Sequence, residues 1–114
     1  MFETWMDVDL QKMPVVKKMD GNLFSGDALA NKIGARVTNN GASVTLSGTV
    51  KAWVIKADGT TEQVTGSKSG NQAWVILPST VYNVPGACGV YLKILDGNSI
   101  TTLCGIEGFI QKGS

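Results

Sequence analysis

The feature that most constrains this chain is a repeated alternation between short runs of Val, Ile, Thr and aromatic residues and clusters of Asn, Asp, Ser and Gly. Runs of this kind are typical of β-strands, while Asn, Asp and Gly readily adopt the backbone angles that hairpin turns require. The turn clusters lie at Asp20-Gly21-Asn22, Asn39-Asn40-Gly41, Asp58-Gly59, Ser69-Gly70-Asn71, Pro85-Gly86 and Asp96-Gly97-Asn98. The pattern therefore predicts an all-β fold.

The segments between the turns predict seven to eight short antiparallel strands. These strands are expected at Val15–Met19, Lys32–Thr38, Ser43–Ser47, Thr49–Lys56, Thr61–Thr65, Gln72–Leu77, Gly89–Leu95 and Ile100–Ile106. Val8–Lys12 is a further extended segment, and Asp27–Asn31 and Ser79–Tyr82 are candidates for single helical turns. Strands of this number and spacing favour an immunoglobulin-like β-sandwich.

The alternation of side chains within a strand predicts which of its faces is buried. Val90, Leu92 and Ile94 share one face of their strand, which we expect to point into the core. The strand Gln72–Leu77 is apolar on both faces, because Trp74 and Ile76 lie opposite its alanine, valine and leucine. An uncovered sheet of this kind promotes aggregation, so we expect another surface to cover it.

The chain has 114 residues, which is enough for one domain. We predict an N-terminal arm and first strand over residues 1–20, followed by the β-sandwich domain over residues 21–114. The arm either packs back on its own sheet or docks into a neighbouring protein, because aromatic residues and Met are enriched at interfaces. Phe2, Trp5 and Met6 are the candidate partner-binding residues.

Several classes of function lack the residues that they need. The chain contains no histidine, which removes the commonest general base and the commonest metal ligand. The Gly66–Gly70 stretch does not have the ending of a P-loop, and two cysteines without histidine are too few for a structural zinc site. We therefore predict a non-enzymatic protein with no catalytic residues, no cofactor and no metal.

Charge and hydropathy argue against two further kinds of partner. The net charge is +1 and the basic residues are scattered, so we expect no nucleic-acid partner. No apolar stretch approaches the ~20 residues of a membrane span, so we expect no membrane partner. Glu3, Asp7 and Asp9 precede any basic residue, unlike the start of a signal peptide, which predicts synthesis in a reducing cytoplasm.

Two pairs of side chains leave two interpretations open. Asp7 and Asp9 face the same side of an extended segment, as part of a cation site or as a solvated strand edge. Cys88 and Cys104 flank the turn at Asp96-Gly97-Asn98, which brings them near each other across a hairpin. They are expected to be buried free thiols, with a disulfide as the alternative.

The aromatic residues of the strands also have two interpretations. Trp53, Trp74, Tyr82 and Tyr91 either pack in the core and at protein interfaces or form a platform on which sugar rings stack. The first interpretation is favoured, because Trp within a strand usually contributes to packing. The second makes the alternative function a carbohydrate-binding β-sandwich module that mediates adhesion to host glycans.

Four turn motifs follow one another in a defined order. They are the Gly26-Asp27 step, Leu46-Ser47-Gly48, the hairpin Lys56-Ala57-Asp58-Gly59, and Pro85-Gly86 before the strand Gly89–Leu95. In this order they resemble the N-terminal domain of phage baseplate upper proteins, over about residues 23–106.

This resemblance implies an immunoglobulin-like fold and a role in attaching proteins to a tailed bacteriophage particle. We therefore expect a structural protein of the virion, synthesised in the host cytoplasm, that binds other virion proteins of the capsid or of the tail and baseplate. A capsid decoration protein, a head-fibre component and a baseplate adaptor all match this expectation. The protein is expected to be a homo-oligomer or to be present in many copies, so that weak contacts add up.

Overall fold

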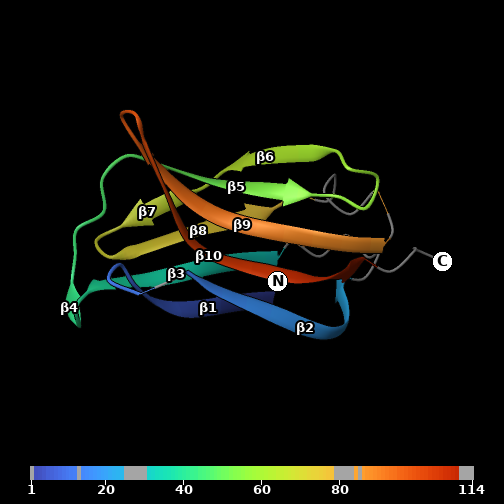
Figure 1. The fold of residues 1–114 in the computed structure, drawn as a ribbon, viewed down its shortest axis with the longest axis horizontal. Helices are drawn as coiled ribbons and strands as arrows, with labels where there is room; N and C mark the ends of the chain where they lie inside the picture. Colours follow the sequence, from blue (N-terminus) through green and yellow to red (C-terminus); the bar gives the residue numbers. More distant parts are fainter. Residues whose placement is uncertain (1, 13, 25–30, 79–83, 85, 111–114) are drawn as a thin grey trace.

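The described residues form two five-stranded sheets (Figure 1). The computed structural model describes residues 2–12, 14–24, 31–78, 84 and 86–110. Sheet I has the order β1 (Phe2–Asp9), β3 (Asn31–Asn39), β8 (Gln72–Leu77) and β7 (Ser67–Ser69), with β4 (Ala42–Ser43) beside β3. Sheet II has the order β2 (Val15–Phe24), β10 (Ser99–Ile110), β9 (Gly86–Asp96), β5 (Thr49–Ile55) and β6 (Thr61–Thr65). The predicted all-β sandwich is confirmed.

The core lies between the two sheets, and strict alternation along the strands supplies it. In β9, every second residue from Cys88 to Ile94 is buried, as predicted for its Val90, Leu92 and Ile94 face. The fully or almost fully buried apolar residues are Met6, Val8, Ile33, Ala35, Val37, Val50, Ala52, Val54, Ala73, Val75, Leu77, Cys88, Val90, Leu92, Ile94, Leu103, Cys104 and Ile106. Because all of them come from strands, the described part of the core needs no helix.

The number and direction of the strands differ in detail from the sequence prediction. The described residues form ten strands, because β1 and the three-residue β7, a pairing of polar residues, add to the eight predicted strands. Two pairs, β1 with β3 and β2 with β10, are parallel. Parallel pairing arises because β1 and β2 each join a different sheet instead of forming a hairpin with one another.

The strand predicted at Ser43–Ser47 is wrong beyond its first residue. Only Ala42–Ser43 pairs, with Thr38 and Asn39 of β3. The chain then crosses from sheet I to β5 of sheet II, so it has no neighbouring strand along which to pair. Val44 and Leu46 are apolar because they pack against the core from this crossing, and the backbone N–H of Leu46 donates to the carbonyl of Gly70.

The N-terminal residues form an edge strand of sheet I. β1 runs parallel to β3 from Phe2 to Asp9, and Met6 is buried in the core. This is the first of the two interpretations of the arm, in which the segment packs on its own sheet. β2 is continuous across residues 20 and 21, where we predicted the boundary between arm and sandwich. The predicted helical turns fall on residues 25–30 and 79–83, outside the described residues, except that Asn31 begins β3.

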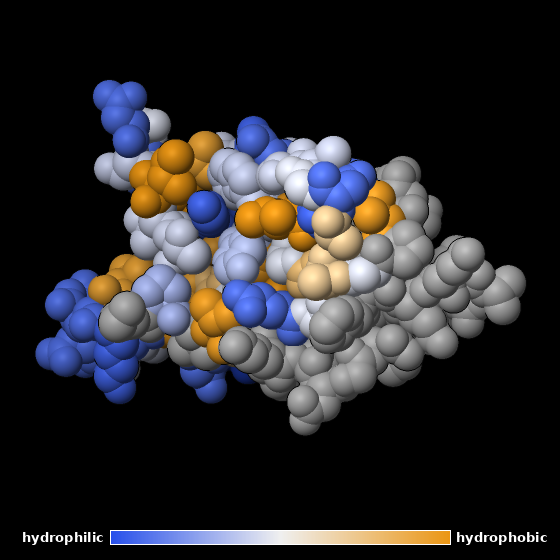
Figure 2. All heavy atoms as spheres, turned by 45° about the vertical axis from the view of Figure 1, so that its right-hand side comes forward, coloured by the Kyte–Doolittle hydropathy of each residue, from blue (hydrophilic) through white to orange (hydrophobic). Residues whose placement is uncertain are grey.

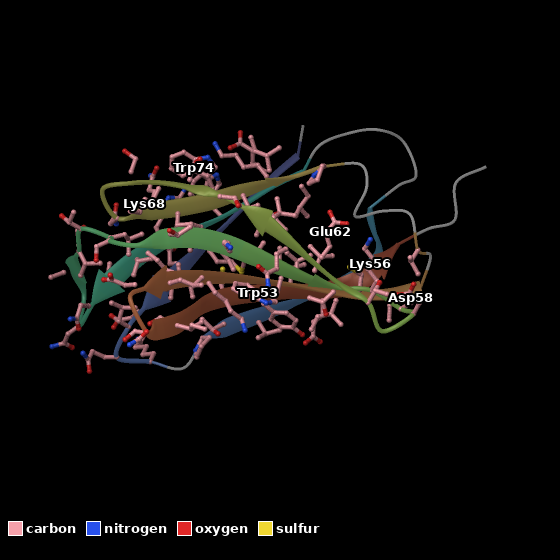
Figure 3. All side chains as sticks on the ribbon, turned by 90° about the horizontal axis from the view of Figure 1, so that it is seen from above. Trp53, Lys56, Asp58, Glu62, Lys68 and Trp74 are labelled. Atoms are coloured by element: carbon pink, nitrogen blue, oxygen red, sulfur yellow. The ribbon has the colours of Figure 1, made fainter. Side chains whose placement is uncertain are left out.

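The hairpin between β5 and β6 is built by the Lys56-Ala57-Asp58-Gly59 motif. Oδ1 of Asp58 accepts hydrogen bonds from the Thr60 hydroxyl (2.6 Å) and the Thr60 backbone N–H (2.9 Å). These bonds lower the pKa of the Asp58 carboxyl from its ordinary value. Behind the turn, the Lys56 ammonium lies 3.1 Å from a carboxylate oxygen of Glu62, and the two side chains point toward one another (Figure 3).

At one edge of the sandwich, the chain passes through Gly66 from β6, the edge strand of sheet II, to β7, the edge strand of sheet I. The backbone N–H of Gly66 donates to the carbonyl of Val50 at 2.8 Å. A Cβ at this position would lie 2.3 Å from the carbonyl oxygen of Trp74, so only glycine permits the approach.

The described residues include no helix long and apolar enough to cross a membrane.

Candidate functional site

The outer face of sheet I carries a cluster of two tryptophans and two cations, which we call the Trp5–Trp74 cluster and define as Trp5, Trp74, Lys32 and Arg36. The strand register places Trp5 and Trp74 on either side of Gly34. Their ring centroids lie 6.3 Å apart with an interplanar angle of 56°. This tilted geometry is one that aromatic pairs prefer, because the edge of one ring meets the face of the other.

Gly34 provides the seat for the Trp5 indole. A Cβ on Gly34 would lie 2.5 Å from both Cε3 and Cζ3 of Trp5, which is far inside van der Waals contact. The ring therefore lies directly over the backbone of β3. A single glycine inside a strand often marks such a close approach, and this was the signal in the sequence that pointed to the cluster and that we missed.

Gly34→Ala is expected to displace the Trp5 ring and to lower the free energy of unfolding by about 1–3 kcal/mol, the usual cost of overpacking. Urea titration followed by tryptophan fluorescence measures both effects. In a Trp5→Ala background the clash is absent, and alanine is favoured over glycine in a strand. The same Gly34→Ala change should then be neutral or slightly stabilising. An equal loss of stability in both backgrounds would show that the Trp5 ring does not pack directly on Gly34.

Cations cover the faces of the two rings. Nζ of Lys32 lies 5.4 Å from the Trp5 centroid and 5.0 Å from the Trp74 centroid, and Cζ of Arg36 lies 5.1 Å from Trp5. Glu3 balances this charge, because its carboxylate lies 3.6 Å from Lys32 and accepts a hydrogen bond from Nε1 of Trp5 at 3.3 Å. A sugar ring stacks on a bare aromatic face, so the occupied faces of this cluster do not favour glycan binding.

The outer face of sheet II carries a second group of aromatic residues. Trp53 of β5 is the register partner of Tyr91 of β9, which in turn faces Gly105 of β10. The Tyr91 ring covers Gly105, where a Cβ would lie 2.7 Å from its Cδ1 atom. The Tyr91 hydroxyl donates to Glu107 at 2.8 Å, and this bond, together with burial, raises the pKa of Tyr91. In Figure 2, apolar residues lie among polar ones over the visible face.

The two aromatic groups lie on opposite sides of the sandwich. Trp53 projects from sheet II and Trp74 from sheet I, as Figure 3 shows. The single platform of Trp53, Trp74, Tyr82 and Tyr91 is therefore not formed, and Tyr82 lies outside the described residues. Alternation placed Trp53 and Trp74 opposite the smaller apolar residues of their strands, but it did not show which face the core covers or which sheet holds each strand.

The three candidate partner-binding residues of the N-terminal segment have different surroundings. Trp5 is half-buried in the Trp5–Trp74 cluster, on the outer face. Met6 points to the opposite side of β1 and is buried in the core. The backbone of Phe2 belongs to β1, but its side chain is not among those that the structure describes. The docking role of these residues stays a prediction.

Asp9 holds the end of β1 against the turn between β3 and β4. Its carboxylate accepts hydrogen bonds from the backbone N–H groups of Gln11 (2.9 Å), Asn40 (3.0 Å) and Gly41 (3.0 Å). These bonds, that of Gln11 first, lower the pKa of Asp9 from its ordinary value of 3.8. Asp7, on the exposed side of β1, lies 3.9 Å from the guanidinium of Arg36. The described residues contain no cluster of three or more acidic or cysteine side chains that would hold a metal ion.

Asp9→Ala is expected to destabilise the protein at neutral pH and not in acid. A carboxyl with a lowered folded-state pKa adds stability above its unfolded-state pKa, and this stability is lost as the pH falls through the folded-state pKa. The difference in urea midpoint between wild type and Asp9→Ala should therefore be full at pH 7 and shrink below pH 3.8. Asp7→Ala, in which an exposed carboxylate is removed, is the control; a difference for Asp9→Ala that does not change with pH would contradict the assignment.

Cys88 and Cys104 are both free and buried. Cys104 faces Leu92 across the hairpin, whereas Cys88 faces Gly108, so the two thiols are four positions apart in register and not opposite one another. Burial raises the pKa of both thiols, that of Cys104 to about 12. Since the thiolate is the reactive form, neither cysteine is suited to nucleophilic chemistry at neutral pH. The prediction of buried free thiols is confirmed.

Comparison with known proteins identifies the fold. No family model matches the sequence, and no curated protein matches it. Among solved structures, the N-terminal domain of phage TP901-1 ORF48 superposes with a TM-score of 0.55 and 12% sequence identity. The match covers 98% of this chain and 100% of that chain. The chain therefore has a β-sandwich fold of the kind found in that phage domain. This confirms the fold that the resemblance to phage baseplate upper proteins implied.

Proposed function

We propose that this protein is a non-enzymatic structural module of a tailed bacteriophage virion, which attaches to other virion proteins. The observation that carries the proposal is the fold match over the whole length of both chains to a domain of a phage protein. The match extends to both ends of the domain, so it covers the parallel edge strands β1 and β2 as well as the core hairpins.

The two outer faces support an attachment role. Trp, Tyr and Arg are the residue types that most often dominate the binding energy of protein interfaces. Here they are concentrated on the outer faces, in the Trp5–Trp74 cluster and in the Trp53 and Tyr91 pair. In a symmetric shell or tail many copies bind at once, so that each contact needs only modest affinity.

Immunoelectron microscopy of purified particles tests the proposal. Antibodies raised against the recombinant chain should label intact particles, because an attached module presents part of its surface. Label on the head indicates a capsid decoration or head-fibre protein, and label at the tail tip indicates a baseplate adaptor. Particles that carry no label and contain no such chain by mass spectrometry would overturn the proposal.

A further inference from the structure

Two lysines on the outer face of sheet II lie directly opposite one another. Lys51 of β5 and Lys93 of β9 are register partners on neighbouring antiparallel strands. Each lies between buried residues of its own strand, so both side chains point to the outer face. Side chains in this relation have Cβ atoms about 4.5–5.5 Å apart, close enough for their charges to repel.

The described part of the protein does not neutralise this pair. Its ion pairs involve Lys32, Arg36 and Lys56, and no described carboxylate pairs with Lys51 or Lys93. Glu107, on the same face, is engaged with the Tyr91 hydroxyl. Like charges directly opposite one another in a sheet are destabilising, so the repulsion between these two lysines is a cost to the fold.

Aromatic and aliphatic surface lies in the adjoining rows of the sheet. Nζ of Lys93 lies 5.0 Å from the ring centroid of Trp53, which holds the ammonium at a defined place. Tyr91 is the register partner of Trp53, and Ile55, two residues beyond Trp53, remains 44% exposed. The surface therefore offers two lysines that no described carboxylate neutralises, beside a half-exposed aromatic pair and an exposed isoleucine.

We propose that this surface, defined as Lys51, Lys93, Trp53 and Ile55, binds an acidic segment of a protein partner that carries a carboxylate next to an apolar side chain. Charge complementarity is the reason for proposing this partner. The paired lysines attract carboxylates, and the adjoining apolar residues can pack against an apolar side chain next to the carboxylate. A nucleic acid fits less well, because two lysines neutralise about two phosphates, too few for useful affinity. That the partner belongs to the virion rests on the proposed function; the carboxylate binding does not.

Titration of the isotope-labelled protein with a short peptide tests the surface directly. The probe is acetyl-Leu-Glu-Glu-Leu-amide, and the matched probe has Gln in place of both Glu residues. The Glu peptide should shift amide resonances around Lys51, Trp53 and Lys93, and the affinity should fall as salt is added. Lys51→Gln/Lys93→Gln should weaken binding about ten-fold, as the sum of two exposed charge pairs.

Lys12→Gln/Lys68→Gln is the control variant, because both residues are exposed, lie outside the surface and change the net charge equally. It should bind the Glu peptide as wild type does. Equal binding of the Gln peptide, resonance shifts spread over all lysines, or tighter binding of a single-stranded oligonucleotide than of the Glu peptide would each overturn the proposal.

Particles assembled with the charge-reversed variant Lys51→Glu/Lys93→Glu separate this proposal from the proposed function. If wild type and Lys12→Glu/Lys68→Glu are incorporated into particles and Lys51→Glu/Lys93→Glu is not, the result supports the proposal that this surface binds a virion partner. Normal incorporation of the variant overturns the surface and leaves the virion role intact. Absence of the wild-type chain from particles overturns the virion role, while the peptide titration still decides whether the surface binds carboxylates.

Discussion

Replacing Leu92 by alanine is expected to lower the free energy of unfolding by about 2–5 kcal/mol, the range for truncating a buried leucine. Leu92 is 0% exposed in β9, which pairs with β5 on one side and β10 on the other. Its register partners are Ala52 and Cys104, both small and both buried. Neither can extend into the space that Leu92 would vacate, so the cavity should persist and the cost should lie in the upper half of the range.

Urea denaturation followed by circular dichroism measures this loss. Ile100→Ala is the matched control, because Ile100 is a similar aliphatic residue of the same hairpin and is 61% exposed. We expect the control to change the free energy of unfolding by no more than about 0.5 kcal/mol. Similar losses for Leu92→Ala and Ile100→Ala would contradict the position of the core between the two sheets.

Gly66→Ala is expected to have the second largest effect, about 1–3 kcal/mol of destabilisation or more. The added methyl group would meet the carbonyl oxygen of Trp74 at 2.3 Å and a methyl group of Val50 at 3.0 Å. The first of these contacts is with backbone, so it cannot be relieved by a change of rotamer. The crossing between β6 and β7 would have to move, which strains the edge of both sheets.

The same urea titration tests Gly66→Ala, with Ser67→Ala as its control. Ser67 is the next residue of the chain and is exposed, so removing its hydroxyl should leave the urea midpoint nearly unchanged. If Gly66→Ala also leaves the midpoint unchanged, the chain does not cross between the sheets at Gly66 in the way described.

Local sequence pattern was enough to place most strands. Thr61–Thr65 and Gln72–Leu77 have the predicted bounds, because alternating side chains and turn residues at both ends define them without reference to other segments. Ser43–Ser47 fails for the opposite reason. Its apolar residues have the composition of a strand, but they pack on the core from a crossing between the sheets, which composition does not reveal.

The surfaces were less accessible to sequence reasoning. The residue types of the Trp5–Trp74 cluster were visible, and Trp5 was selected as a candidate, but its neighbours Lys32, Arg36 and Trp74 come from two other strands. The opposition of Lys51 and Lys93 likewise depends on the register between β5 and β9, segments more than 30 residues apart. Contacts between residues on different strands depend on the register between those strands. The alternation of side chains within one strand gives no information about that register.

From the amino-acid sequence we could predict an all-β sandwich, the core-facing side of regular strands such as β9, and the lack of histidine chemistry. These properties follow from local preferences and from composition. Three properties became visible only in the folded chain: β1 and β2 join different sheets as parallel strands, Trp53 and Trp74 lie on opposite faces, and two lysines meet without a described acidic partner. Those properties depend on which strands become neighbours, and burial of the whole core selects that arrangement.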